Sequence, residues 1–294
     1  MASGKGLTAI LMGGVLAIST SAVLVRLAEA PPLVIAFYRM ALATLFFTPL
    51  ALGKSGGTTL SRKQLFLALG AGTLLAGHFL LWMTSLEYTS VASSVVLVTT
   101  QPLWVFLISA LFLREKPSRL MWLGLLVALM GGIMVTLSQP QTEASRLLGN
   151  MLALGGAIMM AGYLVVGRQL RRDLPLFFYS AIIHGAASIV LALVMWITGA
   201  SFLGYGGQTW PIFLALALVP TVLGHNSLNW ALGYLPATMV SIVVLGEPIG
   251  AAILAALILG EIPSRIEILG SIVTLLGVLL VWWAGSSKNI DQAD

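Results

Sequence analysis

The stretch VVLGEPIGAAILAALILGE, residues 243–261, combines two features that rarely occur together. It is almost wholly apolar, yet Glu247 and Pro248 stand side by side near its start. An ionised carboxylate is costly in an apolar environment, and a proline removes a backbone donor and breaks helical hydrogen bonds. A helix tolerates both residues where it lines a wet cavity inside a larger apolar structure.

The composition indicates that this larger structure is a membrane protein. Of the 294 residues, 59% are hydrophobic and only 9% are charged, whereas soluble proteins carry about 25% charged residues. A soluble core could not enclose so much apolar surface, so the expected solvent is a lipid bilayer. Cysteine is absent, which excludes disulfides and thiol chemistry. Loop residues facing anionic lipid explain the net charge of +5, so no nucleic-acid partner is expected.

Apolar segments of about 20 residues recur along the chain, and each is long enough to cross a bilayer as a helix. The short connections between them leave no room for a soluble domain, and the segments lack the alternation of a β-barrel. We therefore expect an all-α polytopic membrane protein with ten transmembrane helices. The ten segments are approximately 7–26, 33–52, 64–86, 91–113, 119–138, 147–168, 176–199, 209–233, 236–259 and 265–284.

The distribution of basic residues predicts the orientation. Most of the 15 lysines and arginines fall near the N-terminus and in the even-numbered connections. Because cytoplasmic loops carry the excess of basic residues, this pattern places both termini in the cytoplasm of a bacterial-type inner membrane. The first apolar segment is too long for a typical secretory signal, so we expect it to be kept as the first transmembrane helix.

The chain also repeats itself. Residues 86–131 read LEYTSVASSVVLVTTQPLWVFLISALFLREKPSRLMWLGLLVALMG, and residues 232–277 read LGYLPATMVSIVVLGEPIGAAILAALILGEIPSRIEILGSIVTLLG. A constant shift of 146 residues pairs Pro102 with Pro248 and aligns the two PSR motifs. Both copies also contain the pair LG followed, seven residues later, by another glycine.

The repeat divides the chain into two five-helix units, residues 1–140 and 141–294, which together form one transmembrane unit. Because five is an odd number, the second unit must enter the membrane in the opposite orientation. Inverted repeats are typical of secondary transporters, in which the substrate site lies near the midplane between the halves. The repeat therefore predicts alternating access.

These features resemble the drug/metabolite transporter superfamily. The resemblance rests on the two five-helix units, on QP and GEP in the fourth and ninth segments, and on REKPSR and GEIPSR before the fifth and tenth. It is strongest to the EamA-type branch, which includes amino-acid and metabolite exporters, and it covers nearly the whole chain. It implies ten helices, a central cavity and export of a small molecule. This chain departs from an exact repeat by having Gln101 where the second unit has Glu247.

Polar side chains within the apolar segments are the candidate substrate ligands. His78 and Trp82 are four residues apart and share a helical face, and His225 and Asn229 repeat this spacing in the second unit. A carboxylate in such a wall would suit a substrate ammonium or a proton. The candidate substrate-binding residues are His78, Trp82, Ser94, Gln101, Tyr163, His225, Asn229 and Glu247.

Each assignment competes with a structural one. Pro102 and Pro248 are expected to kink their helices and are candidate hinges. Glu247 either binds substrate or hydrogen-bonds a neighbouring helix. Arg39 either meets a substrate carboxylate, gates the exit, or anchors its helix by extending to the membrane interface, and the sequence favours the anchor. The histidines lie on separate segments with no carboxylate in ligand spacing, so no metal site is expected.

We therefore expect a secondary transporter that exports small metabolites, in the first place amino acids, from the cytoplasm. Its partners would be the solute, membrane lipid and, as a candidate, protons, and no cofactor is expected. The alternative is a multidrug carrier for lipophilic cations. A channel fits less well because no ring of charges or filter loop is visible, and an intramembrane enzyme because no nucleophile elbow is present.

Overall fold

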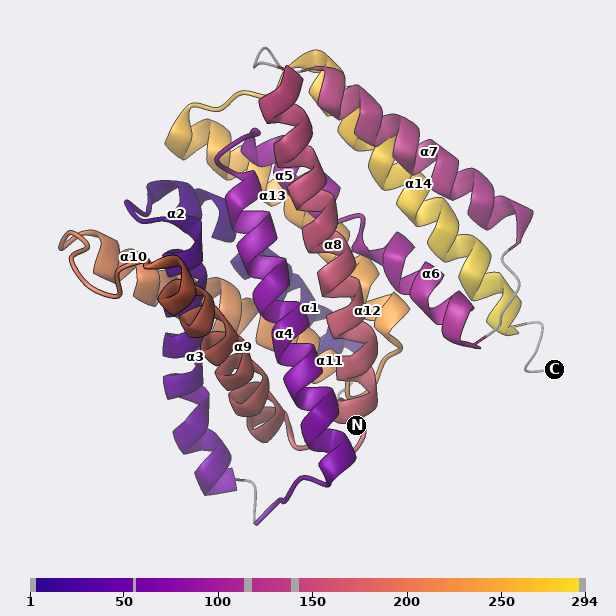
Figure 1. Ribbon diagram of the computed structural model, residues 1–294. Helices are drawn as coiled ribbons and strands as arrows, with labels where there is room; N and C mark the ends of the chain where they lie inside the picture. The colour runs from indigo at the N-terminus through magenta and orange to yellow at the C-terminus, as the bar shows by residue number, and fades with distance from the viewer. Residues whose placement is uncertain (1–3, 55–56, 114–117, 139–142, 291–294) are drawn as a thin grey trace.

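The structure, a computed structural model, is built almost entirely of helices (Figure 1). It describes residues 4–54, 57–113, 118–138 and 143–290. Within these ranges the chain forms α-helices, two π-helical segments and a 3-10 turn, and no strand. The predicted all-α fold class is confirmed for this part of the chain.

The elements follow one another with short connections. Those of the first half are α1 (Gly4–Ser19), α2 (Ser21–Leu27), α3 (Pro32–Lys54), α4 (Arg62–Ser85), α5 (Val91–Val98), α6 (Gln101–Leu113) and α7 (Arg119–Leu137). Those of the second half are α8 (Glu143–Arg171), α9 (Leu176–Thr198), α10 (Thr209–Leu216), η1 (Ala217–His225), α11 (Asn226–Ala231), α12 (Ala237–Val243), η2 (Val244–Gly246), α13 (Glu247–Leu254), η3 (Ala255–Leu259) and α14 (Arg265–Ile290).

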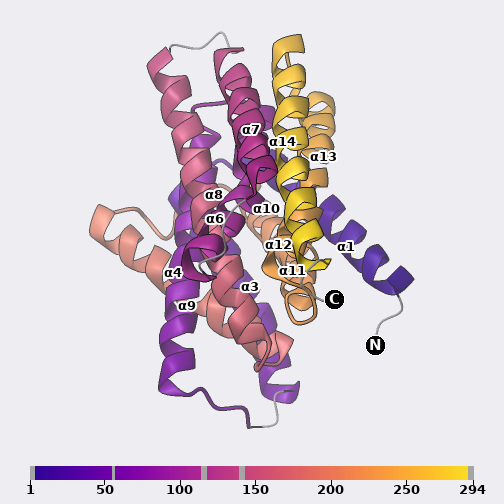
Figure 2. The ribbon, with the colours of Figure 1, turned by 90° about the vertical axis from the view of Figure 1, so that its right-hand side faces the viewer.

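Eight helical segments of the described chain are long and apolar enough to cross a membrane. They are Ala9–Leu27, Pro32–Gly53, Arg62–Ser85, Val91–Ile108, Ala144–Arg171, Leu176–Thr198, Thr209–Ala231 and Ala237–Leu259. The apolar helices α7 and α14 pack against each other beside them (Figures 1 and 2). The count of ten transmembrane helices stays a prediction.

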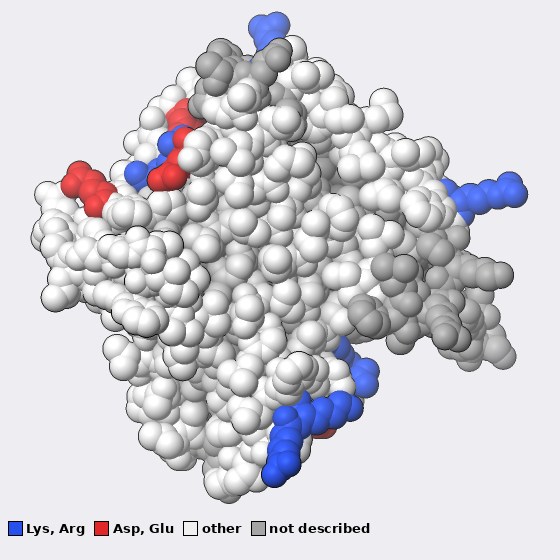
Figure 3. All heavy atoms as spheres, viewed as in Figure 1, with Lys and Arg blue, Asp and Glu red and all other residues white. Residues whose placement is uncertain are grey.

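The surface fits a lipid environment. Large apolar side chains are exposed, among them Leu52 at 82%, Leu257 at 78% and Trp196 at 76%. Figure 3 shows a broad central face without charged side chains, with the visible lysines, arginines and acids toward its margins. Exposed apolar surface on this scale is costly in water and favourable in a bilayer, so the protein is a multi-pass membrane protein.

Two membrane-crossing segments are broken at their prolines. α5 ends at Val98 and α6 begins at Gln101, which places Pro102 in the first turn of a new helix. Pro248 likewise lies in the first turn of α13, directly after the 3-10 turn η2. Proline is well tolerated there, because the first backbone N–H groups of a helix have no intrahelical partner. The chain thus accommodates Glu247 and Pro248 by restarting the helix.

The contacts between the two halves are reciprocal. α4 packs along α8, and α1 packs against η1 and α11. In the predicted repeat α1 corresponds to α8, and α4 corresponds to the η1–α11 segment. Exchanging the two units therefore converts the contact of α4 with α8 into the contact of the η1–α11 segment with α1. The pairs α3 with α9 and α7 with α14 map onto themselves, and the pair α5 with α13 maps onto the pair α12 with α6.

Glycines show the same reciprocity at the α7–α14 crossing. A Cβ added to Gly124 would lie 2.8 Å from the Gly277 carbonyl oxygen, and one added to Gly270 would lie 2.9 Å from that of Gly131. A Cβ on Gly131 would also stand 2.3 Å from the backbone nitrogen of Thr274. Such distances are below any van der Waals contact, so glycine is needed for this close helix approach.

Candidate functional site

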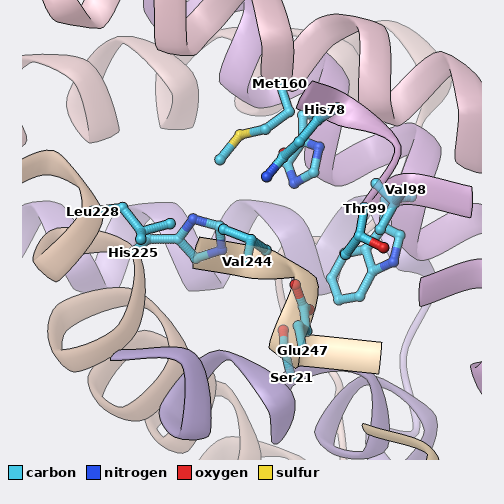
Figure 4. Close-up of a pocket in the computed structure, with 11 residues that line it drawn as sticks. Ser21, His78, Val98, Thr99, Met160, His225, Leu228, Val244 and Glu247 are labelled. Atoms are coloured by element: carbon cyan, nitrogen blue, oxygen red, sulfur yellow. The ribbon is translucent and has the colours of Figure 1, made fainter. Parts of the chain in front are cut away.

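A small polar cavity lies inside the bundle, with walls from both halves of the chain (Figure 4). The space open to the centre of a water molecule is about 20 Å³, enough for one or two waters and too small for an amino acid. In this conformation the cavity therefore has to widen before it can hold a solute. It is lined by Ser21, His78, Trp82, Val98, Thr99, Gln101, Met160, His225, Leu228, Val244 and Glu247.

Glu247 is the acidic side chain of this wall. Its residue is only 6% exposed, and within the described chain no hydrogen bond to its carboxylate is formed. Figure 4 shows Glu247 and Ser21 on one side of the cavity and His78 on the opposite side. Its position in the first turn of α13 lets the positive end of the helix dipole stabilise its charge. A buried carboxylate that faces a cavity without a partner suits a ligand better than a brace to a neighbouring helix.

The aromatic residues line the other sides of the cavity. The Nδ1 of His78 lies 2.9 Å from the carbonyl oxygen of Gly156, so a proton on Nδ1 is donated to that oxygen and the neutral ring keeps Nε2 as an acceptor. The His78 ring is parallel to that of Trp82, and the His225 ring centre is 6.4 Å from that of His78. The buried Nε1 donor of Trp82 has no hydrogen-bond partner. The wall thus offers a free donor and a free acceptor.

Arg39 lies behind the cavity and is fully buried, so the anchor interpretation from the sequence is wrong. Its Nε donates to Thr221 Oγ1 and its Nη1 to Ser21 Oγ, both at 2.7 Å. The guanidinium carbon lies 4.1 Å from the ring centre of Phe79. These three contacts hold the guanidinium inside the bundle, where it cannot extend to the interface.

Two predicted ligands of the second half bond to each other outside the cavity wall. The Tyr163 hydroxyl donates to Asn229 Oδ1 at 2.5 Å, and both side chains are buried. Asn229 was expected on the face of His225, four residues earlier. His225 is the last residue of η1, and Asn229 lies one turn later in α11. Of the two, only His225 lines the cavity, while Asn229 bonds to Tyr163 of α8.

Ser94 also lies outside the cavity wall, where its hydroxyl is 2.6 Å from that of Ser85. Ser94 and Gln101 are seven residues apart, which in one continuous helix would place them on the same face. Because α5 ends before Gln101, the two residues belong to different helices and share no face. Of the predicted ligands, His78, Trp82, Gln101, His225 and Glu247 line the cavity together.

A second, wider cavity lies at the end of the bundle where the chain passes from η3 to α14. About 460 Å³ of it is open to the centre of a water molecule. At its edge Arg26 forms an ion pair with Glu261 at 2.6 Å, and the other Glu261 oxygen accepts from the Val91 backbone nitrogen at 3.1 Å. We call this cavity the vestibule, and it is lined by Arg26, Ser90, Ala92, Ser138, Ala252, Ala255, Glu261, Ile262, Pro263, Ser264 and Glu267.

The vestibule and the inner cavity lie along the same helices. α2 contributes Arg26 to the vestibule and Ser21 to the inner cavity, and α13 contributes Ala252 and Glu247 respectively. Glu261 carries no local sequence signal of this role, because its contacts join residues far apart in the chain. In the described part of the chain, no group of three or more His, Cys, Asp or Glu residues is placed to hold a metal ion.

Comparison with known proteins identifies the family. The model of the EamA-like transporter family matches the chain twice, over residues 5–137 and 147–283. The protein belongs to the EamA-like transporter family. Two matches of similar length agree with a chain built from two related units.

Curated relatives of this EamA-like protein include named exporters. The pseudopaline exporter CntI of Pseudomonas aeruginosa is 26% identical over 255 residues, covering 86% of each chain. The threonine/homoserine exporter RhtA of Escherichia coli is 28% identical over 261 residues, covering 86% of this chain and 80% of RhtA. A solved crystal structure with 17% sequence identity has a TM-score of 0.69 and covers 95% of this chain, which shows a shared fold.

Proposed function

We propose that this EamA-like protein is a secondary transporter that exports small zwitterionic metabolites, in the first place amino acids, from the cytoplasm. The observation that carries the proposal is the buried, unpartnered carboxylate of Glu247 in a polar cavity between the two halves. A substrate ammonium, or a proton, is the natural partner of such a group. The names of CntI and RhtA support export of metabolites of this kind.

Reciprocal packing supports alternating access between inverted repeats. The contacts between halves map onto one another when the predicted units 1–140 and 141–294 are exchanged, as expected for a two-fold relation. Two half-helices, α6 and α13, begin at the cavity, as do the broken helices of many transporters. Pro102 and Pro248 at these breaks remain our candidate hinges.

The expected orientation determines which side of the membrane the vestibule faces. With both termini in the cytoplasm of an inner membrane, the vestibule faces the outside, because Arg26 and Glu261 lie at odd-numbered connections. Solute would enter the inner cavity from the cytoplasm and leave through the vestibule. Closure of one side while the other opens would make the protein a carrier instead of a channel.

Uptake of radiolabelled L-threonine into liposomes that contain the purified protein tests this proposal. We expect saturable uptake that unlabelled amino acids inhibit and that empty liposomes do not show. Inhibition by lipophilic cations, with no effect of amino acids, would instead support the multidrug alternative.

A further inference from the structure

Arg39 carries a positive charge inside the bundle and is 0% exposed. Its Nε and Nη1 have hydroxyl partners in Thr221 and Ser21, whereas its buried Nη2 has no hydrogen-bond partner. A charge at this depth is costly unless an opposite charge lies near it. Two hydroxyl contacts do not neutralise the charge, so an acidic group is expected near Arg39.

Glu247 is the group that balances it. The two groups attract each other when both are ionised, and Ser21 connects them, since it accepts from Arg39 and lines the cavity together with Glu247. The structure nevertheless records no direct ion pair between these two described residues. The Glu247 carboxylate and the Nη2 of Arg39 thus both retain hydrogen-bonding capacity that the protein does not use.

On the basis of the proposed export function, we infer that Arg39, acting through Ser21, is the positioning residue that makes the cavity select zwitterions over cations and anions. When Arg39 and Glu247 are both ionised, the pair carries no net charge. A zwitterion preserves this neutrality, whereas a cation or an anion leaves a net charge in a region of low dielectric constant.

Ser21 supplies the chemical link. Its oxygen accepts the Arg39 hydrogen bond, which leaves its own proton free to be donated into the cavity. A substrate carboxylate would take this donor while the substrate ammonium meets Glu247. Arg39 polarises the hydroxyl and fixes its direction, so its effect on the substrate is exerted through Ser21.

Three probes of one size test the charge rule: L-threonine as zwitterion, L-threoninamide as cation and 2,3-dihydroxybutanoate as anion. Transport of each is measured as kcat/KM in liposomes containing the full-length protein, after subtraction of flux into empty liposomes. Wild-type protein should favour threonine over both analogues. Arg39→Gln should lower the threonine-to-threoninamide ratio by roughly tenfold or more, the scale of one lost charge-assisted hydrogen bond.

Companion variants separate charge selection from folding. Arg39→Lys keeps the charge and should retain the preference for threonine at reduced rate. Ser21→Ala keeps the guanidinium but removes the link, and should lower the same ratio even if Arg39→Gln does not fold. Thr221→Val is the matched control, since it removes the other hydroxyl partner of Arg39 away from the cavity, and should leave the ratio unchanged.

The outcomes distinguish this inference from the proposed function. If threonine is transported but the ratio is the same in wild type, Arg39→Gln and Ser21→Ala, the charge rule is wrong and the export function stands. If Thr221→Val changes the ratio as strongly as Ser21→Ala, Arg39 has only a structural role. If the wild type moves none of the probes, both proposals fail.

Discussion

Replacement of Glu247 by glutamine removes the charge from the inner cavity and keeps the shape of the side chain. Because Glu247 is 6% exposed and its carboxylate has no hydrogen-bond partner in the described chain, a substrate ammonium would be its main partner. Loss of one hydrogen bond to a charged group costs about 1.5–3 kcal/mol. We therefore expect KM for threonine to rise roughly 10- to 150-fold in Glu247→Gln.

Folding should respond differently from transport. Glutamine leaves the buried charge of Arg39 without its balancing carboxylate, so Glu247→Gln should unfold at a lower denaturant concentration than wild type. Initial rates of threonine uptake into liposomes and unfolding in detergent measure the two effects separately. An unchanged KM would refute the ligand role of Glu247, and an unchanged stability would refute its charge balance with Arg39.

The repeat provides a second arm of this test. Gln101 occupies the position in the first unit that Glu247 occupies in the second, and both line the same cavity. The double variant Gln101→Glu with Glu247→Gln moves the acid across the cavity. It should recover part of the lost affinity if the site lies on the two-fold axis. A double variant no better than Glu247→Gln alone would show that the acid works only from α13.

Further predictions concern the scaffold, the vestibule and the orientation. A Cβ at Gly131 would lie 2.3 Å from an α14 backbone nitrogen, whereas one at Gly132 would meet only the end of a leucine side chain at 3.3 Å. Gly131→Ala should therefore be about 1–3 kcal/mol less stable to unfolding than Gly132→Ala, and equal stabilities would contradict the tight crossing. Glu261→Gln removes the ion pair at the vestibule edge, so a cysteine placed at Ala252 should react faster with a thiol reagent. An unchanged labelling rate would show that the ion pair does not restrict access to the vestibule. A Gly206→Cys variant should react with a membrane-impermeant thiol reagent in intact cells. Absence of this reaction would contradict the predicted topology.

Much of the fold could be read from the sequence because lipid imposes simple requirements. Apolar segments of membrane-crossing length place most of the helices, and the helical periodicity of His78 and Trp82 predicts their common face. The internal repeat brings Gln101 and Glu247 to corresponding places, and both line the cavity. These predictions depend on local spacing, which the chain preserves.

The remainder depends on breaks in helical regularity and on tertiary contacts. Asn229 bonds to Tyr163 outside the cavity wall, and the break before Gln101 separates Gln101 from Ser94. Apolar lining residues such as Met160 have no polar signal that would single them out. The buried position of Arg39 depends on hydroxyls from other helices, which sequence spacing alone does not bring together.

Counterflow of radiolabelled threonine tests the central claim of alternating access most directly. Liposomes containing the protein are loaded with unlabelled threonine and diluted into a trace of labelled threonine. A carrier that exposes its site to one side at a time should accumulate the label transiently above the external concentration, and Glu247→Gln should weaken this overshoot. Label that only equilibrates without overshoot, at a rate independent of internal threonine, would contradict the account and indicate a channel.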